Sequence, residues 1–140
     1  MLSETEMTAI AKFTIAVLIG LLIGFARRRK AAGKRTFALL CLGSTIFTTV
    51  SVMTYGTGDP MRVVAQIVSG IGFLGLGVIW KHEGKPTGLT TAAAVWVTAA
   101  IGILIGLGMW IEMLAGSVLV LLILYSKEPL QKVTRNVEKK

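Results

Sequence analysis

The chain has 140 residues, of which 54 % are hydrophobic and only 16 % are charged, and its mean hydropathy is +0.74. This composition excludes an ordinary soluble domain and places the chain among integral membrane proteins. The net charge is +8, but the basic residues lie between and after apolar segments, which argues against a nucleic-acid-binding face. The single cysteine, Cys41, lies in an apolar run and is interpreted as a small buried hydrophobic residue.

Five apolar segments follow one another along the chain, at residues 7–26, 36–55, 59–80, 89–107 and 110–125. A helix of about 20 residues spans about 30 Å, which is enough to cross a bilayer once. The short connection at Gly106-Leu107-Gly108 predicts that the last two segments form an antiparallel hairpin. The predicted fold class is an all-α integral membrane protein with five transmembrane helices in a domain of residues 1–126. Residues 127–140 are predicted to form a basic cytoplasmic tail.

The distribution of positive charge predicts the orientation of these segments. Six Lys and Arg residues lie between the first two segments, two lie between the third and fourth, and five lie in the tail, which makes thirteen of the fifteen. Cytoplasmic loops of membrane proteins carry such an excess. We therefore predict that the N-terminus is outside and the C-terminus is cytoplasmic, with only Lys12 and Arg62 in the outer half.

The third segment carries polar side chains that a lipid-facing helix would not be expected to carry. At about 100° per residue, Asp59, Arg62, Gln66, Ser69 and Phe73 share one arc of the helix. An Arg in hydrocarbon costs roughly 2.5–3.5 kcal/mol, so lipid is the least expected neighbour of this face. Arg62 either extends to the interface and pairs with Asp59, or acts in a functional site. Gln66 either makes an interhelical hydrogen bond or lines a polar pathway.

Small residues recur at a spacing of four in the first and fourth segments and fill much of the third. This spacing allows membrane helices to approach each other closely. The candidate helix-packing residues are Gly20, Gly24, Gly70, Gly72, Gly75, Gly77 and Gly102.

Catalytic and metal sites have little support in the sequence. No nucleophile and base, and no pair of carboxylates, stand out within the apolar segments. Asp59 is the one acid of the polar cluster, whereas Mg²⁺ needs several oxygen ligands. His82 is the single histidine and is interpreted as a solvent-exposed loop residue. We therefore predict neither an enzyme nor a metal or cofactor site.

The third and fourth segments contain the run DPMRVVAQIVSGIGFLGLG from Asp59, the run GLTTAA from Gly88, and Trp96. With these motifs the chain closely resembles the bacterial MgtC/SapB family. The resemblance extends over nearly the whole chain, including Gly20, Gly24 and the basic loop. It implies a small multi-pass protein of the bacterial inner membrane, associated with magnesium homeostasis, virulence-related survival in macrophages, restraint of ATP synthase and altered phosphate handling.

Three positions and one domain depart from the family pattern. The first segment of the family ends in Gly-x-Glu-Arg-Glu, whereas Ala26 and Arg28 stand at the two acidic positions here. Thr87 stands where the family has an Arg before the fourth segment. The chain is also expected to be a membrane-domain-only member that lacks the soluble C-terminal domain. The missing acids argue against any mechanism that needs an inner carboxylate.

Two functions from different classes remain open. The first is a regulator of another membrane protein, such as ATP synthase or a transporter, or of magnesium and phosphate homeostasis. The second is an oligomeric ion or small-solute transporter or channel, with a polar path at Asp59, Arg62 and Gln66. The expected partners are the lipid bilayer, a second copy in a homodimer or other homo-oligomer, and a membrane protein, but no nucleic acid.

Overall fold

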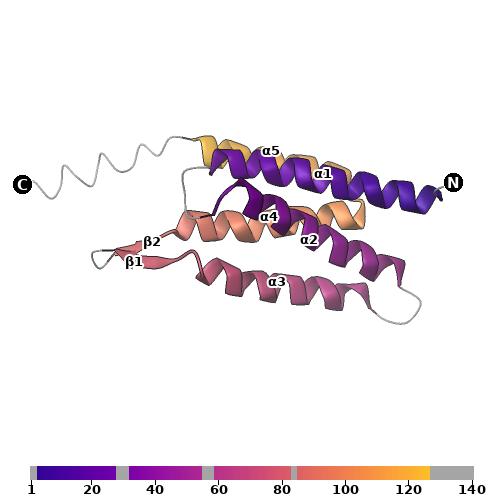
Figure 1. Cartoon of the computed structure of the whole chain (residues 1–140), viewed down its shortest axis with the longest axis horizontal. Coiled ribbons are helices and arrows are strands. Elements are labelled where there is room, and N and C mark those ends of the chain that lie inside the picture. Colours follow the sequence, from indigo (N-terminus) through magenta and orange to yellow (C-terminus); the bar gives the residue numbers. More distant parts are fainter. Residues whose placement is uncertain (1–2, 28–31, 55–58, 83–84, 127–140) are drawn as a thin grey trace, which may run out of the picture.

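The computed structural model describes residues 3–27, 32–54, 59–82 and 85–126. The predicted cytoplasmic tail at 127–140 lies outside these residues. The described chain forms five helices and one short antiparallel hairpin (Figure 1). In chain order these are α1 (Glu4–Ala26), α2 (Lys34–Met53), α3 (Pro60–Leu76), β1 (Trp80–His82), β2 (Lys85–Thr87), α4 (Leu89–Leu107) and α5 (Trp110–Tyr125).

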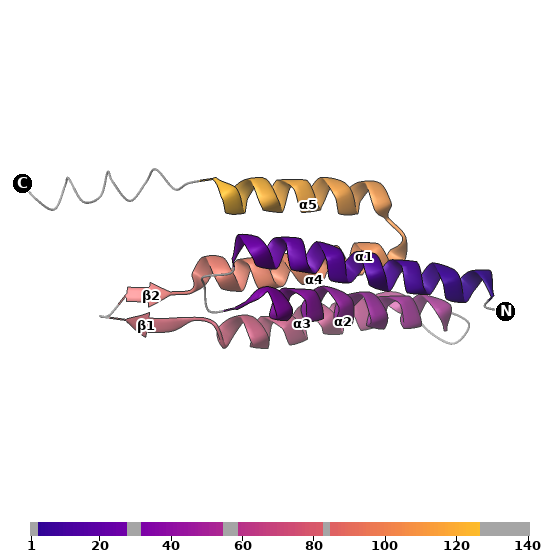
Figure 2. The ribbon, with the colours of Figure 1, turned by 45° about the horizontal axis from the view of Figure 1, so that its top comes forward.

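The helices lie side by side along one long axis, with α3 and α5 at opposite edges of the bundle (Figures 1 and 2). Helix α4 packs against all four other helices, and α2 packs against α1, α3 and α4. Three helices, α1, α2 and α4, are long and apolar enough to cross a membrane, while α3 and α5 are shorter apolar helices. The predicted all-α membrane architecture is thus confirmed in its helical content, and the hairpin is an addition to it.

The helix ends show where the predicted segments were right and where they were wrong. The fourth and fifth segments match α4 and α5. Helix α1 begins three residues earlier than predicted, because Ser3 and Glu6 form a capping box that satisfies free backbone N–H groups.

Helix α3 ends at Leu76 rather than at the predicted Trp80, which instead pairs with Thr87 in the hairpin. The glycines near this end lower the helix propensity, and residues 77–79 leave the helix before the strand begins at Trp80. Gly88 follows the hairpin with φ of 87°, and a Cβ there would collide with the Val78 carbonyl. Only glycine fits this close, left-handed turn without strain.

The tightest packing joins α1, α2 and α4 through glycines. A Cβ added at Gly20 would lie 2.6 Å from the Cα of Ala38, and one added at Gly102 would lie 2.5 Å from the carbonyl oxygen of Cys41. Such distances leave no room for a side chain, so each glycine allows two backbones to touch. Around these contacts lie fully buried apolar side chains, among them Ile23, Phe37, Ile101 and Ile105.

Hydroxyl groups supply a second kind of contact within this core. The Thr45 hydroxyl lies 2.9 Å from the Cys41 carbonyl oxygen of its own helix and 2.9 Å from the Gly102 carbonyl oxygen of α4. Thr48 and Thr98 donate to the carbonyl four residues earlier, as hydroxyls in membrane helices commonly do. Thr45 therefore joins α2 to α4, while the hydroxyls of Thr48 and Thr98 are satisfied within their own helices.

Candidate functional site

The polar cluster of α3 begins at its N-terminus. Asp59 is the N-cap, and its carboxylate accepts a hydrogen bond of 2.9 Å from the Met61 N–H. Pro60 occupies the first helical position, where its missing N–H is not needed. The Ser51 hydroxyl of α2 donates to the Pro60 carbonyl at 3.1 Å and ties the two helices together. Asp59 thus starts the helix that carries the rest of the cluster.

The other members of the cluster face outward. Arg62, Gln66 and Ser69 are all exposed, and Phe73 on the same face is 79 % exposed. Within the described residues, no ion pair joins Asp59 to Arg62, and the Gln66 amide makes no hydrogen bond to protein. The shared helical face expected from the sequence is therefore present, but no helix of the described residues covers it.

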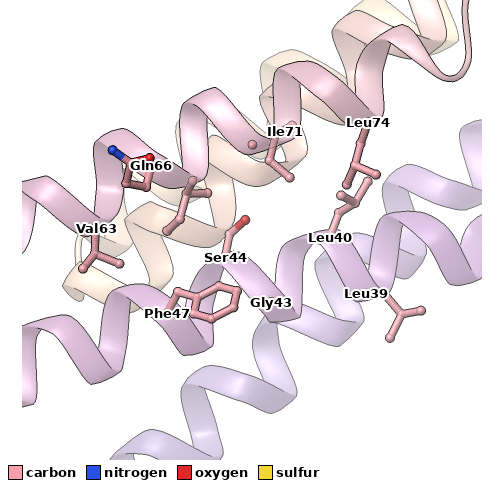
Figure 3. A pocket seen from close by; sticks show the side chains of 11 residues that line it. Leu39, Leu40, Gly43, Ser44, Phe47, Val63, Gln66, Ile71 and Leu74 are labelled. Carbon is pink, nitrogen blue, oxygen red and sulfur yellow. The ribbon is translucent and has the colours of Figure 1, made fainter.

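A groove of about 420 Å³ lies beside this face, between α2 and α3 (Figure 3). We name it the α2–α3 groove. Its walls are mostly apolar, and they include Gly43, Ser44 and Phe47 from α2 and Gln66, Gly70 and Ile71 from α3. Pockets with apolar walls and a few polar groups are typical binding sites.

Ser44 supplies a buried polar group to this groove. Its side chain is 3 % exposed, and its hydroxyl has no hydrogen-bond partner in the described structure. Figure 3 shows this hydroxyl directed toward the space between the two helices. The position follows from the α2–α4 contact, because a Cβ at Gly102 would lie 2.8 Å from the Cβ of Ser44. An unpaired buried hydroxyl costs about 1–3 kcal/mol, so a group that enters the groove and bonds to it would gain that energy.

The candidate packing glycines divide into two sets. Gly20, Gly24 and Gly102 are in contact with neighbouring backbone, whereas a Cβ at Gly70 or Gly72 would meet nothing within 4 Å. A Cβ at Gly75 would make ordinary contact with Ala92 at 3.9 Å, and one at Gly77 would approach only the Leu74 carbonyl of its own helix, at 3.3 Å. The middle of α3 thus differs from the expectation, since its glycines are open rather than packed.

Two basic residues have roles that the sequence analysis did not assign. Arg27 was counted with the basic loop, but it is half-buried and its guanidinium donates to the Thr91 hydroxyl at the start of α4. Thr91 therefore accepts from another helix instead of capping its own, which has no side-chain cap. Lys12 donates to the Gly106 carbonyl at 2.7 Å. In the sequence, the position of Lys12 inside an apolar segment was the one sign that this lysine is unusual.

The side chains that commonly bind metal ions are those of His, Cys, Asp and Glu. Among the described residues there is no group of three or more His, Cys, Asp or Glu side chains that could hold an ion. The arrangement presents hydrogen-bonding groups and small residues on a surface, which is suited to binding another molecule.

Comparison with known proteins agrees with the sequence motifs. An uncharacterized protein of Synechocystis is 42 % identical over 124 residues, which cover 87 % of this chain and 53 % of that protein. Protein MgtC of Salmonella typhimurium is 47 % identical over 108 residues, covering 76 % of this chain and 46 % of that protein. Protein MgtC of Brucella abortus is 49 % identical over 96 residues, covering 67 % and 40 %.

The chain spans about half the length of the curated relatives it matches. No solved structure matches it. The model of the MgtC family matches residues 13–133, which is most of the chain. On this match and on these relatives, the chain belongs to the MgtC family.

Proposed function

We propose that this protein binds a transmembrane helix of another protein in the α2–α3 groove and thereby regulates that protein. We place it in the bacterial inner membrane with five crossings, the N-terminus outside and the C-terminus in the cytoplasm. The excess of positive charge in the expected cytoplasmic loops supports this orientation.

The observation that carries the proposal is the exposure of polar and small residues on α3. Arg62, Gln66 and Ser69 are exposed, although polar groups in hydrocarbon are stabilised when they face protein or water. Next to them, Gly70 has open space where a Cβ would lie. A helix with small residues of its own could approach closely here and offer hydrogen bonds to Ser44 and Gln66.

The resemblance to MgtC proteins suggests the process in which such regulation would act. Magnesium and phosphate homeostasis are the proposed setting, and ATP synthase or a transporter is the proposed kind of partner. Because the chain spans about half of its curated relatives, this setting is a proposal for the membrane domain alone.

A variant that fills the groove tests the proposal. Gly70→Leu places a large side chain in open space in the groove, so the chain should fold normally but lose its partner. Gly116→Leu is the matched control, because Gly116 on α5 also has nothing within 4 Å of an added Cβ. In cells, a photo-crosslinking residue at position 66 should give one crosslinked membrane protein that Gly70→Leu abolishes and Gly116→Leu retains.

The effect on activity completes this test. ATP synthesis by membrane vesicles should differ between cells with and without the protein, and Gly70→Leu should remove the difference. If both leucine variants retain the crosslink and the difference in ATP synthesis, the groove is not the binding surface.

The second candidate function is an oligomeric transporter. The exposed polar residues of α3 favour it in an assembly in which a second copy of the chain covers this helix. Asp59, Arg62 and Gln66 would then line a path between protomers, and a homodimer with α3 near its interface would be required. Liposomes with purified protein should show no flux of Mg²⁺, phosphate or protons if the protein is a regulator. Flux that disappears in Arg62→Ala would instead support the transporter.

A further inference from the structure

A second cavity, of about 320 Å³, opens between α1 and α2 at the end of the bundle where α1 begins. We name it the Lys12 cavity. It shares no lining residue with the α2–α3 groove, and it is lined by Glu4, Thr5, Thr8, Ala9 and Lys12 of α1 with Thr49 and Met53 of α2. A cation, an acid and three hydroxyls make its walls far more polar than those of the groove.

Lys12 places a positive charge in this cavity. The side chain is half-buried, and its ammonium donates one hydrogen bond of 2.7 Å to the Gly106 carbonyl in the last turn of α4. An ammonium has three N–H donors, so two remain for other groups. The carbonyl holds the ammonium in place but carries no full charge to compensate it.

Thr49 provides a second, independent indication of a ligand. It is 5 % exposed, and its hydroxyl has no hydrogen-bond partner in the described part of the chain. Thr45, one turn earlier on the same helix, and Thr48, the preceding residue, both donate to the carbonyl four residues before them. The Thr49 hydroxyl has no such bond, and Thr49 is one of the residues that line the cavity.

We propose that the Lys12 cavity binds the phosphate group of a phospholipid. The two remaining N–H groups of Lys12 and the Thr49 hydroxyl would donate to the phosphate oxygens, and hydrogen bonds between charged groups of this kind are strong. The cavity lies at the end of the apolar helices, the level at which headgroup phosphates occur in a bilayer. Its volume exceeds that of a single ion and suits a headgroup.

Glu4 favours a headgroup that also carries a positive charge. It lines the same cavity eight residues before Lys12, which is about 12 Å along the helix toward its start. A phosphate near Lys12 and an ammonium on the side of Glu4 would follow the order of the two charged groups in an ethanolamine headgroup. Free phosphate would satisfy Lys12 and Thr49 but leave Glu4 without a counterpart.

Thermal unfolding of the purified chain in nonionic detergent tests this inference. The chain is titrated with short-chain phosphatidylethanolamine, with inorganic phosphate, and with diacylglycerol of the same chain length. We expect the phospholipid to raise the unfolding temperature and diacylglycerol to leave it unchanged. Lys12→Met should raise the half-maximal lipid concentration at least about tenfold, and Thr49→Val should raise it about fivefold.

Two controls match these changes. Lys34→Met removes a lysine that is exposed at the start of α2 and lies over the Phe25 ring rather than in a cavity. Thr14→Val removes an exposed hydroxyl that bonds only to the Ile10 carbonyl of its own helix. Both variants should respond to the phospholipid as the unmodified chain does.

The outcomes separate the sources of phosphate and can overturn the proposal. Stabilisation by inorganic phosphate that needs Lys12 would assign the same site to the free ion. Equal stabilisation of the unmodified chain, Lys12→Met and Thr49→Val would exclude the site, as would equal stabilisation by diacylglycerol. If Lys12→Met fails to fold, the half-maximal lipid concentration of the isosteric Thr49→Val variant tests the site in its place. None of these outcomes depends on a partner in the α2–α3 groove.

Discussion

Glycine is used in two opposite ways in this protein. In the α1–α2–α4 core, Gly20 and Gly102 are in direct contact with the backbone of another helix. On α3, Gly70 and Gly72 face open space. The two regions have the same kind of residue, yet the first is a packed interface within the chain, and the second meets no neighbour among the described residues. The difference shows that the presence of glycines in an apolar helix does not by itself identify a helix contact within the chain.

The polar groups follow the same division. In the core, the Thr45 hydroxyl bonds to its own helix and to α4. Beside α3, the Ser44 hydroxyl has no partner among the described residues and the Gln66 amide is exposed. Ser44 and Thr45 are neighbours in the sequence, so one turn of α2 carries both a satisfied and an unsatisfied hydroxyl. We interpret the second set of groups as belonging to an interface with another molecule.

The largest effect is expected from Gly102→Ala. Its added Cβ would lie 2.5 Å from the Cys41 carbonyl oxygen, so α2 and α4 would have to separate. Overpacking of this kind typically costs about 1–3 kcal/mol, and we expect the free energy of unfolding in micelles to fall by about 3 kcal/mol. Gly116→Ala is the control at an open position. Equal stability of the two variants would show that the α2–α4 contact is looser than described.

An intermediate effect is expected from Thr45→Val, which keeps the shape of the side chain and removes its hydroxyl. The lost interhelical hydrogen bond to Gly102 should lower the free energy of unfolding by about 1 kcal/mol. Thr14→Val serves as the comparison, because the Thr14 hydroxyl is exposed and bonds only within its own helix. If Thr14→Val lowers the free energy of unfolding by as much as Thr45→Val, the hydrogen bond between α2 and α4 does not contribute to stability.

The smallest effect on folding is expected from Ser44→Ala. Because the Ser44 hydroxyl is buried without a partner, its removal should leave the free energy of unfolding unchanged or raise it by up to about 1 kcal/mol. The crosslink at position 66 should nevertheless weaken, since the bound helix would lose a hydrogen bond. Marked destabilisation of the isolated chain would place this hydroxyl in the core rather than in an interface.

The sequence predicts the fold well where turns mark the ends of the helices. Helix α4 lies between Gly88 and Gly108, which both have positive φ, and its predicted bounds were right. The predicted end of α3 was wrong because its apolar run continues without interruption to Trp80, and hydrophobicity alone does not show where a helix gives way to a turn and a short strand. The Trp80–Thr87 pairing depends on contacts across a turn that the run itself does not encode.

The candidate site could be predicted only in part. Helical periodicity placed Arg62, Gln66 and Ser69 on one face, and the structure has them so. Periodicity could not show that no helix of the described chain covers this face, because that depends on how α3 packs beside α2 and α4. The sequence does not single out Ser44 and Thr49 either, since helix α2 holds five hydroxyl residues between positions 44 and 51. Only the contacts of each residue in the folded chain distinguish these two from the other three.

In the proposed five-crossing topology, the early end of α3 makes the protein sensitive to the thickness of its membrane. At 17 residues, this helix is about 26 Å long, whereas the hydrocarbon layer is about 30 Å thick. Helix α1, with 23 residues, exceeds that thickness at about 35 Å. The α3 edge therefore favours a thin bilayer, as does the opposite edge formed by the 16-residue α5, while α1 tolerates a thick one, at a cost of fractions of a kcal/mol per ångström of mismatch. Lipids with shorter acyl chains should gather along α3, the same edge that carries the open glycines.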